Sequence, residues 1–142
     1  MAGKRATLAT LMKRQLVAID GTRSVREAVA MMVREDTGSV FVTAEERVVG
    51  ILTERDVLRA ALAEREVFDN PVHAIMSSPL FTLASNASPF EALEFMAKKG
   101  IRRVPVTVRG QVRGLVTQRD LVNWLVSHPE EIPHLVSGKT LI

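Results

Sequence analysis

The sequence predicts an α/β fold of the α+β type, built from two β-α-β-β-α units that pack by their sheets about a pseudo-twofold axis. Three observations lead to this fold class. Residues 8–62 align with residues 72–126 without a gap, at an offset of 64 positions. Within each copy the hydrophobic period changes in the same order. A unit of about 55 residues buries little surface alone, so the two copies are expected to pack together.

The first half of each unit is predicted to be a short strand followed by a helix. The extended runs are QLVAI at 15–19 and PLFTL at 79–83. The helix begins after Ser24 or Ser88, because Glu27 or Glu91 follows three residues later and can complete a capping box. At helical spacing, the buried faces are predicted to be Val25, Ala28, Val29, Met32 and Val33 in the first copy and Ala92, Leu93, Met96 and Ala97 in the second.

The second half of each unit is predicted to be a β-hairpin followed by a helix. Two β-branched runs, SVFVT with VVGIL or RVPVT with VRGLV, flank the turns AEER and VRGQ. The apolar pairs of the closing helices are Val57, Leu58, Ala61 and Leu62 in the first copy and Leu121, Val122, Leu125 and Val126 in the second. The expected domains are residues 1–66 with the N-terminal segment, a linker at 67–71, residues 72–127, and a tail at 128–142.

Composition restricts the possible functions. Of 142 residues, 46% are hydrophobic and 25% charged, as in soluble globular proteins. Cysteine is absent, which excludes disulfides and thiolate chemistry and fits a reducing cytoplasm. Since no run approaches the roughly 20 apolar residues that cross a bilayer, and the basic N-terminus lacks a signal-peptide core, we expect a cytoplasmic protein with no membrane attachment. The net charge of +3 favours anionic partners, but aromatic residues at 4% argue against nucleic acid.

No metal or catalytic site is predicted. His73, His128 and His134 share no spacing typical of zinc sites and have no cysteine partners. No serine, histidine and acid set stands at suggestive positions, so we expect no enzyme activity and no required cofactor. The methionines at positions 12, 32, 76 and 96 are repeat-equivalent and are expected to fill the core.

The strings GILTERD and GLVTQRD, at 50–56 and 114–120, join the last strand of each copy to its closing helix. One interpretation is structural, because a threonine three residues before an aspartate can cap a helix. The other is a ligand site. A threonine hydroxyl beside unpaired N–H groups suits a phosphate or hydroxyl, and the carboxylate of Asp56 or Asp120 can accept both hydroxyls of a ribose. The glycine that opens each string permits close approach of a ligand or a strand.

The gapless pair, the element order, these two strings and GIRRVPV at 100–106 together resemble the tandem CBS domain, or Bateman module. The resemblance covers residues 8–127. It implies a stand-alone, non-catalytic regulatory or energy-sensing module with two clefts between its halves. In such modules the clefts bind adenosine-containing ligands such as AMP, ADP, ATP or S-adenosylmethionine.

Carried over residue by residue, the resemblance implies two clefts, each combining the aspartate of one copy with strand entrances of the other. The Asp120 cleft is expected to comprise Met12, Val17, Thr37, Gly38, Ser39, Arg102, Arg103, Leu115, Thr117, Arg119 and Asp120. The Asp56 cleft is expected to comprise Ile51, Thr53, Arg55, Asp56, Met76, Phe81, Ile101, Arg102 and Arg103.

The two clefts are expected to differ in charge. In the family pattern, basic residues at the positions of Arg102 and Arg103 hold the phosphates of the ligand whose ribose Asp120 binds. The matching residues of the first copy, Gly38 and Ser39, bring no charge. The Asp120 cleft is therefore predicted to be the better phosphate site, because charge-assisted contacts are roughly twice as strong as neutral ones. The alternative is that one arginine lies on the solvent side of its strand.

Other residues leave their roles open. The Asp56 cleft is expected to bind weakly or stay empty, and Phe81 either narrows it or stacks on a purine. Arg55 and Arg119 are equally consistent with surface positions in the first turn of a helix.

Two further functions remain as alternatives. One is a dimeric scaffold that binds a second copy, or an unidentified regulated protein, through the helix faces. The residues expected to supply such surfaces are Val57, Leu58, Val122, Trp124 and Leu125. The other is RNA or DNA binding, which the calculated pI of about 9.8 suggests and which would be salt-sensitive.

Overall fold

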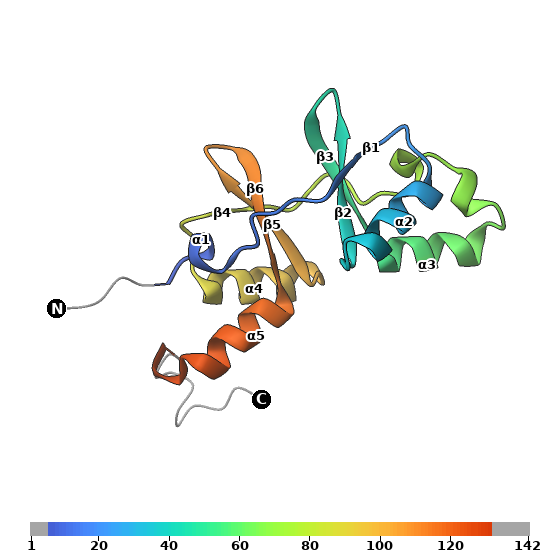
Figure 1. Cartoon of the computed structure of the whole chain (residues 1–142). Coiled ribbons are helices and arrows are strands. Elements are labelled where there is room, and N and C mark those ends of the chain that lie inside the picture. The colour runs from blue at the N-terminus through green and yellow to red at the C-terminus, as the bar shows by residue number, and fades with distance from the viewer. Residues whose placement is uncertain (1–5, 132–142) are drawn as a thin grey trace. The chain divides into compact units, whose positions relative to one another are not determined.

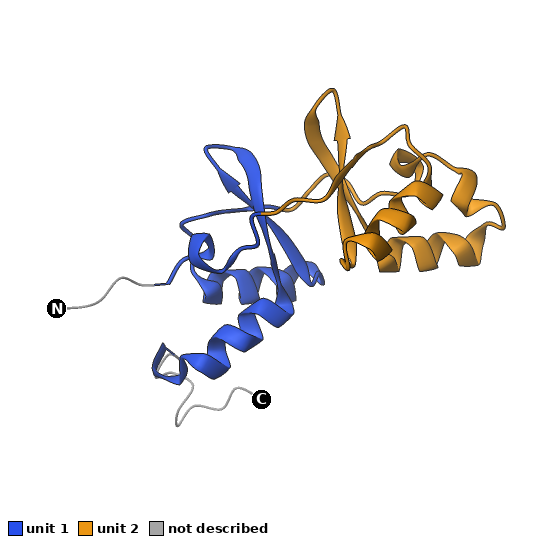
Figure 2. Cartoon of the chain, in the orientation of Figure 1, with its two compact units in different colours: residues 1–14, 82–142 blue, residues 15–81 orange. Residues whose placement is uncertain are grey.

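The structure is a computed structural model that describes residues 6–131. Residues 1–5 and 132–142 lie outside the described part, and with them His134 and most of the expected tail. The chain folds into two compact units (Figure 2). Unit 2 is the continuous stretch 15–81, and unit 1 combines the described residues before 15 with those after 81.

Unit 2 contains a three-stranded sheet with two helices beside it (Figure 1). Its elements are β1 (Ala18–Asp20), α2 (Val25–Arg34), β2 (Ser39–Ala44), β3 (Arg47–Thr53), α3 (Glu54–Ala63), and the 3-10 turns η1 (Val67–Asp69) and η2 (Val72–Ala74). The strand order is β1-β2-β3, with β1 parallel and β3 antiparallel to the central strand. Helix α2 contacts β2, and α3 contacts β3.

Unit 1 repeats this arrangement with its own sheet. Its elements are α1 (Leu8–Leu11), β4 (Leu83–Ala84), α4 (Pro89–Lys99), β5 (Arg103–Val108), β6 (Gln111–Thr117), α5 (Gln118–Ser127) and the 3-10 turn η3 (Pro129–Glu131). The strand order is β4-β5-β6 with the same strand directions. The α+β fold class and the β-α-β-β-α order of each repeat are therefore confirmed.

The first strand of each unit is shorter than predicted and lies later in the chain. Both runs were expected to be extended over five residues, yet β1 has three residues and β4 has two. In unit 2 the N–H of Phe41 donates to the carbonyl of Val17 at 2.8 Å. The repeat-equivalent residue of Phe41 is Pro105, in the central strand of unit 1. Proline has no N–H to donate, which accounts for the shorter pairing of β4 with β5.

The starts of α2 and α4 agree with the prediction. Ser24 caps α2 by accepting a hydrogen bond from the N–H of Glu27, and Ser88 caps α4 in the same way. Most of the predicted buried faces are buried or half-buried, but Val33 is 76% exposed. At about 100° per residue, Val33 lies roughly 80° around the helix from Val25, at the edge of the apolar stripe. The equivalent Ala97 is also exposed, so both positions are corrections.

The two hairpins form as predicted, with turns that need left-handed backbone. Glu45 and Glu46 have φ of 51° and 65°, and Arg109 and Gly110 have φ of 53° and 78°. Two consecutive residues with positive φ are typical of the turn type that matches the twist of paired strands. Each hairpin also has a register shift, after Val42 or after Val106.

The compact units are offset from the sequence repeats, because the first segment of each repeat packs into the other repeat's core. Leu8 and Met12 are buried in the core of unit 1, next to α5 and β6. Val72 is buried in the core of unit 2, and Val67 is buried in η1, which contacts α2 and α3. Residues 67–81 therefore belong structurally with the repeat that precedes them.

The closing helices bury only part of their apolar residues. Leu121 is fully buried, whereas Leu58 and Leu62 are 68% and 92% exposed. Trp124 was expected to supply a surface, but this is wrong, because it is 8% exposed and packs between two rings, edge-on to Phe90 and stacked on His128. Its ring centroid lies 5.8 Å from that of Phe90 and 5.1 Å from that of His128. No helix within residues 6–131 is long and apolar enough to span a bilayer.

Candidate functional site

The two repeated strings place a full capping box at the start of each closing helix. The N–H of Thr53 donates to Asp56 Oδ2 at 2.8 Å, and the N–H of Asp56 donates to Thr53 Oγ1 at 3.2 Å. The corresponding distances between Thr117 and Asp120 are 2.9 and 3.1 Å. The capping interpretation is therefore confirmed in both copies. Since a box uses only one carboxylate oxygen, the other oxygen decides what else each aspartate can do.

The second oxygen of Asp56 is engaged inside unit 2. Ser77 Oγ donates to Asp56 Oδ1 at 2.9 Å, and Thr53 Oγ1 adds a 3.0 Å bond to Oδ2. Both oxygens of the carboxylate thus accept hydrogen bonds from the protein. Asp56 is only 8% exposed and is, with Ser39, one of two polar residues that are buried in the part of the chain that the structure describes.

The second oxygen of Asp120 is in a different state. Within residues 6–131, its Oδ1 accepts no hydrogen bond, and its Oδ2 accepts only that of the Thr117 N–H. Asp120 is half-buried rather than buried. It therefore presents an acceptor oxygen toward solvent from a position that the capping box fixes.

Two arginines stand beside Asp120 because of the strand register. Arg103 at the start of β5 pairs with Thr117 at the end of β6, and the N–H of Gln118 donates to the Arg102 carbonyl at 2.9 Å. Arg102 is exposed and Arg103 half-buried, and Arg103 has an interaction partner in the protein. The backbones of both arginines are thus fixed beside the start of α5, the helix whose capping aspartate, Asp120, is the less buried of the two.

The same register in unit 2 brings uncharged residues to Asp56. Ser39 pairs with Thr53, and the N–H of Glu54 donates to the Gly38 carbonyl at 3.0 Å. Ser39 is buried. The difference in charge between the two helix starts is therefore a property of each unit by itself.

The glycine of each string makes room for a methionine. A Cβ on Gly50 would lie 2.6 Å from the sulfur of Met76 and 2.9 Å from the Ser77 carbonyl oxygen, and a Cβ on Gly114 would overlap the sulfur of Met12. Each glycine was predicted to permit close approach of either a ligand or a strand. The structure shows a neighbouring segment of the chain against both glycines. Met12 is 7% exposed and Met76 packs against its core, so both act as filler, as predicted.

The predicted site residues divide between the two units. Unit 1 holds Met12, Ile101, Arg102, Arg103, Leu115, Thr117, Arg119 and Asp120, and unit 2 holds Val17, Thr37, Gly38, Ser39, Ile51, Thr53, Arg55, Asp56, Met76 and Phe81. Arg55 and Arg119 are exposed, and Phe81 is 43% exposed. The threonine and aspartate lie together within each unit, and in unit 1 both arginines lie beside them.

Two residues escaped the sequence analysis, Ser77 and its repeat equivalent Lys13. Each directly follows the methionine that packs on the glycine. Ser77 exchanges two backbone hydrogen bonds with Ile51, at 2.8 and 3.1 Å, and Lys13 exchanges two with Leu115, at 2.9 and 3.0 Å. The gapless alignment contained the signal, because it places a serine opposite a lysine at this position.

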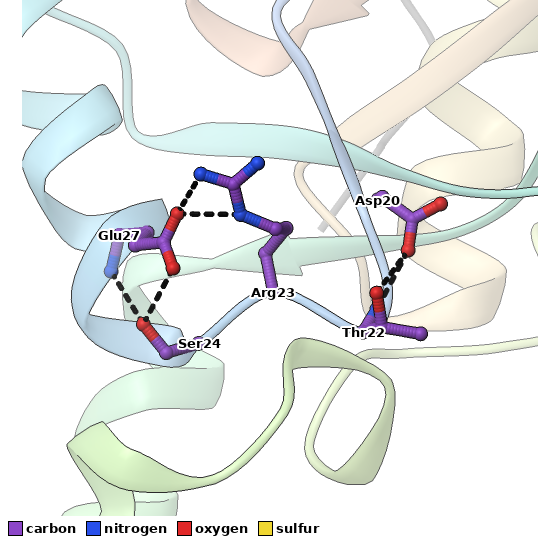
Figure 3. Close-up of polar contacts among 5 residues, drawn as sticks. All are labelled: Asp20, Thr22, Arg23, Ser24 and Glu27. Carbon is purple, nitrogen blue, oxygen red and sulfur yellow. Dashed lines mark hydrogen bonds and ion pairs between the residues drawn. The ribbon is translucent and has the colours of Figure 1, made fainter.

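A second polar cluster stabilises the start of α2 (Figure 3). Arg23 Nε donates to Glu27 Oε2 at 2.6 Å, and this bond lowers the pKa of Glu27 and raises that of Arg23. The hydroxyl and N–H of Thr22 donate to Asp20 and lower the pKa of that carboxyl. Glu27 thus directs its carboxylate chiefly to Arg23, and the backbone and hydroxyl of Ser24 add smaller contributions to its lowered pKa.

No group of three or more histidine, aspartate or glutamate side chains is placed to hold a metal within the described residues. His128 is instead bound to the Trp124 carbonyl, with Nδ1 3.0 Å from the oxygen. Its ring therefore belongs to the aromatic cluster of unit 1.

The fold and the paired helix starts define a class of protein, a tandem of two α+β units that each open their last helix with a Thr–Asp box. A CBS domain model matches residues 8–63 and again residues 72–127. The chain belongs to the CBS domain family and contains two CBS domains.

Known proteins place the chain among CBS domain pairs. An uncharacterized 33.4 kDa protein encoded in a ribosomal RNA operon of Thermofilum pendens is 36% identical over 82% of this chain, which spans only 39% of that protein. The solved CBS domain protein NE2398 is 30% identical, with a TM-score of 0.80 over 85% of this chain and 98% of its own. The CBS domain protein PAE2072 from Pyrobaculum aerophilum, complexed with AMP, is 29% identical, with a TM-score of 0.75 over 86% and 99%.

Proposed function

We propose that this protein is a non-catalytic regulatory module that binds an adenine nucleotide, AMP, ADP or ATP, at the Asp120 helix start. The observation that carries the proposal is the half-buried Asp120 carboxylate, which has one oxygen outside the capping box and two arginines at the adjoining strand end. The Pyrobaculum relative complexed with AMP supports the class of ligand.

Each group in unit 1 has a distinct chemical role in the proposal. Asp120 Oδ1 accepts hydrogen bonds from the ribose hydroxyls, because an ionised carboxylate is an acceptor only. Arg102 and Arg103 donate to the phosphate, where charge-assisted hydrogen bonds are strongest. S-adenosylmethionine, the alternative ligand, has the same ribose but no phosphate, so the arginine pair favours the nucleotides over it.

Regulation follows from differential binding. A ligand shifts a conformational equilibrium only by the difference in its affinity for the two states. We propose that nucleotide binding favours one state of the module or of a regulated protein partner.

Thermal unfolding with AMP, ADP, ATP, adenosine and S-adenosylmethionine tests the proposal. A ligand at about 100 times its Kd stabilises the protein by about 2.7 kcal/mol. We expect the nucleotides to raise the Tm more than adenosine does. No shift with any of the five ligands, in protein purified free of bound nucleotide, would contradict the proposed function.

The arginine roles require a separate comparison. Arg102→Ala should weaken AMP binding by about tenfold or more, because a hydrogen bond to a charged group contributes about 1.5–3 kcal/mol. The matched control is Arg109→Ala, an exposed arginine at the hairpin turn of the same unit. Adenosine affinity should be the same in both variants. An equal effect on adenosine and AMP would contradict the phosphate role.

A second candidate function is a homodimer formed through the closing helices. Leu58 and Leu62 on α3 and Val122 and Val126 on α5 are 68%, 92%, 48% and 77% exposed. Exposed apolar side chains in such groups are typical of association surfaces. Sedimentation velocity tests this, because Leu62→Glu with Val126→Glu should convert a dimer into a monomer. A wild-type protein that sediments as a monomer would contradict it.

A further inference from the structure

We propose that the residue following the packed methionine determines which aspartate is available to a ligand: Ser77 closes Asp56, and Lys13 leaves Asp120 open. The inference rests on the proposed function, since it concerns the same pair of helix starts.

The closing contact lies entirely within unit 2. Ser77 Oγ donates to Asp56 Oδ1 at 2.9 Å. The capping box uses the other oxygen, Oδ2, which accepts from the Thr53 N–H. The hydroxyl therefore occupies the place that a ribose hydroxyl would take on this carboxylate. A ligand hydroxyl must compete with this bond for Oδ1, on a carboxylate that is only 8% exposed.

The backbone holds Ser77 in this position. Ser77 and Ile51 exchange hydrogen bonds in both directions, at 2.8 and 3.1 Å. Ile51 is five residues before Asp56, on the strand that leads into the capping box. Because this pairing fixes the Cα of Ser77 beside β3, the short serine side chain can reach only its immediate surroundings, and Asp56 is among them.

Lys13 occupies the equivalent place in unit 1 without closing it. Lys13 and Leu115 exchange the same two backbone hydrogen bonds, so the Lys13 side chain leaves the backbone on the side that corresponds to the Ser77 hydroxyl. Lys13 is exposed, and within the described residues it forms no ion pair with Asp120. A lysine has no hydroxyl near its backbone, and within the described residues its ammonium group is not within ion-pair distance of the Asp120 carboxylate.

The consequence is a difference in ligand access that the shared Thr–Asp motif does not encode. Both aspartates cap their helices, but only Asp120 retains a free acceptor oxygen within the described structure. The identity of residue 13 or 77 thus acts as a specificity determinant, because it sets whether the carboxylate bonds to its own chain or to a ligand.

Binding measurements on the full chain test the role of Ser77 directly. In an Asp120→Ala background, where only the Asp56 site remains, Ser77→Ala should raise AMP affinity by about two- to tenfold, as expected from one net hydrogen bond. Adding Asp56→Ala should remove that gain. The matched control, Ser78→Ala, changes the neighbouring exposed serine and should leave affinity unchanged. No gain in Ser77→Ala, or an equal gain in Ser78→Ala, would overturn the inference.

The reciprocal change tests Lys13 and distinguishes the effect of adding a hydroxyl from the effect of removing the positive charge. Lys13→Ser should lower AMP affinity at Asp120 by about two- to tenfold. Lys13→Met removes the charge without adding a hydroxyl and should lower affinity less. If both variants weaken binding equally, loss of charge explains the effect and the inference is wrong.

A ligand-free measurement separates failure of this inference from failure of the proposed function. A double-mutant cycle on urea unfolding with Ser77→Ala and Asp56→Ala should give a favourable coupling, and a cycle with Ser78→Ala should give none. Coupling in a protein that binds no nucleotide would contradict the proposed function but support the Ser77–Asp56 bond. Absence of coupling would overturn the inference whatever the nucleotide result.

Discussion

At the scale of single residues, identical motif positions acquire different properties from their neighbours. Thr53–Asp56 and Thr117–Asp120 form the same capping box, yet Asp56 accepts a further bond from Ser77 and is buried. A cap of this kind contributes about 1 kcal/mol to stability, so it explains the motif in both copies without a ligand. The proposed ligand site therefore depends on what the cap leaves unused, and only Asp120 has an unused oxygen within residues 6–131.

The cluster at the start of α2 gives a prediction on pH. Because Arg23 bonds to Glu27 and lowers the pKa of its carboxyl, Glu27 stabilises the folded state above the pKa it has when unfolded. That contribution is lost as the pH falls through the folded value. Arg23→Ala should raise the pKa of Glu27 toward 4.5, as measured by carbon NMR of the carboxyl.

The neighbouring arginine provides the control for this measurement. Arg26 lies over the Phe68 ring and pairs with Asp69 at 3.5 Å, so Arg26→Ala should leave the Glu27 pKa unchanged. A wild-type Glu27 that titrates at or above 4.5 would contradict the assignment.

At the scale of secondary-structure elements, the features predicted correctly are those that residues close in sequence determine. The Ser24 and Ser88 caps, the hairpin turns and the start of the closing helices follow from residues close in sequence, and the structure has them. The short β4 did not follow from its own run, since it depends on Pro105 in the strand it pairs with. Val33 was misassigned because it fits the helical spacing of the buried face but lies at the edge of the apolar stripe, where the side chain is exposed.

The parts of the site that sequence reasoning missed depend on distant pairings. Nothing in the local chemistry of Ser77 distinguishes it from a linker serine, and its bond to Asp56 spans 21 positions. The affiliation of residues 8–12 with unit 1 was also missed, because their short apolar pattern does not indicate which sheet they join. Arg102 and Arg103 were predicted because the repeat alignment shows both their charge and their position at the start of a strand.

The short helix α1 provides the test at this scale. Leu8 is fully buried in the core of unit 1, so Leu8→Ala should lower the free energy of unfolding by about 2–5 kcal/mol. Val33→Ala is the control, because that valine is 76% exposed and its loss should change stability by no more than about 0.5 kcal/mol. Urea unfolding measures both, and a Leu8→Ala variant as stable as wild type would show that α1 is not part of the core.

At the scale of the whole molecule, the chain is a tandem CBS protein whose two units share a fold but differ in charge and in carboxylate access. Unit 1 has Asp120, Arg102 and Arg103 at one helix start, whereas unit 2 has Gly38 and Ser39 where unit 1 has the arginines. A module with two nearly equivalent sites would respond to nucleotide over two binding steps. We expect this one to respond chiefly through a single site.

The central claim is that Asp120, and not Asp56, is the main nucleotide contact. Calorimetric titration of AMP into Asp120→Ala and Asp56→Ala tests it directly, because each substitution removes the same kind of capping box and the loss of a cap is therefore matched. We predict that Asp120→Ala weakens AMP binding by about tenfold or more and that Asp56→Ala changes it by less than about threefold. A larger loss in Asp56→Ala than in Asp120→Ala would contradict the claim.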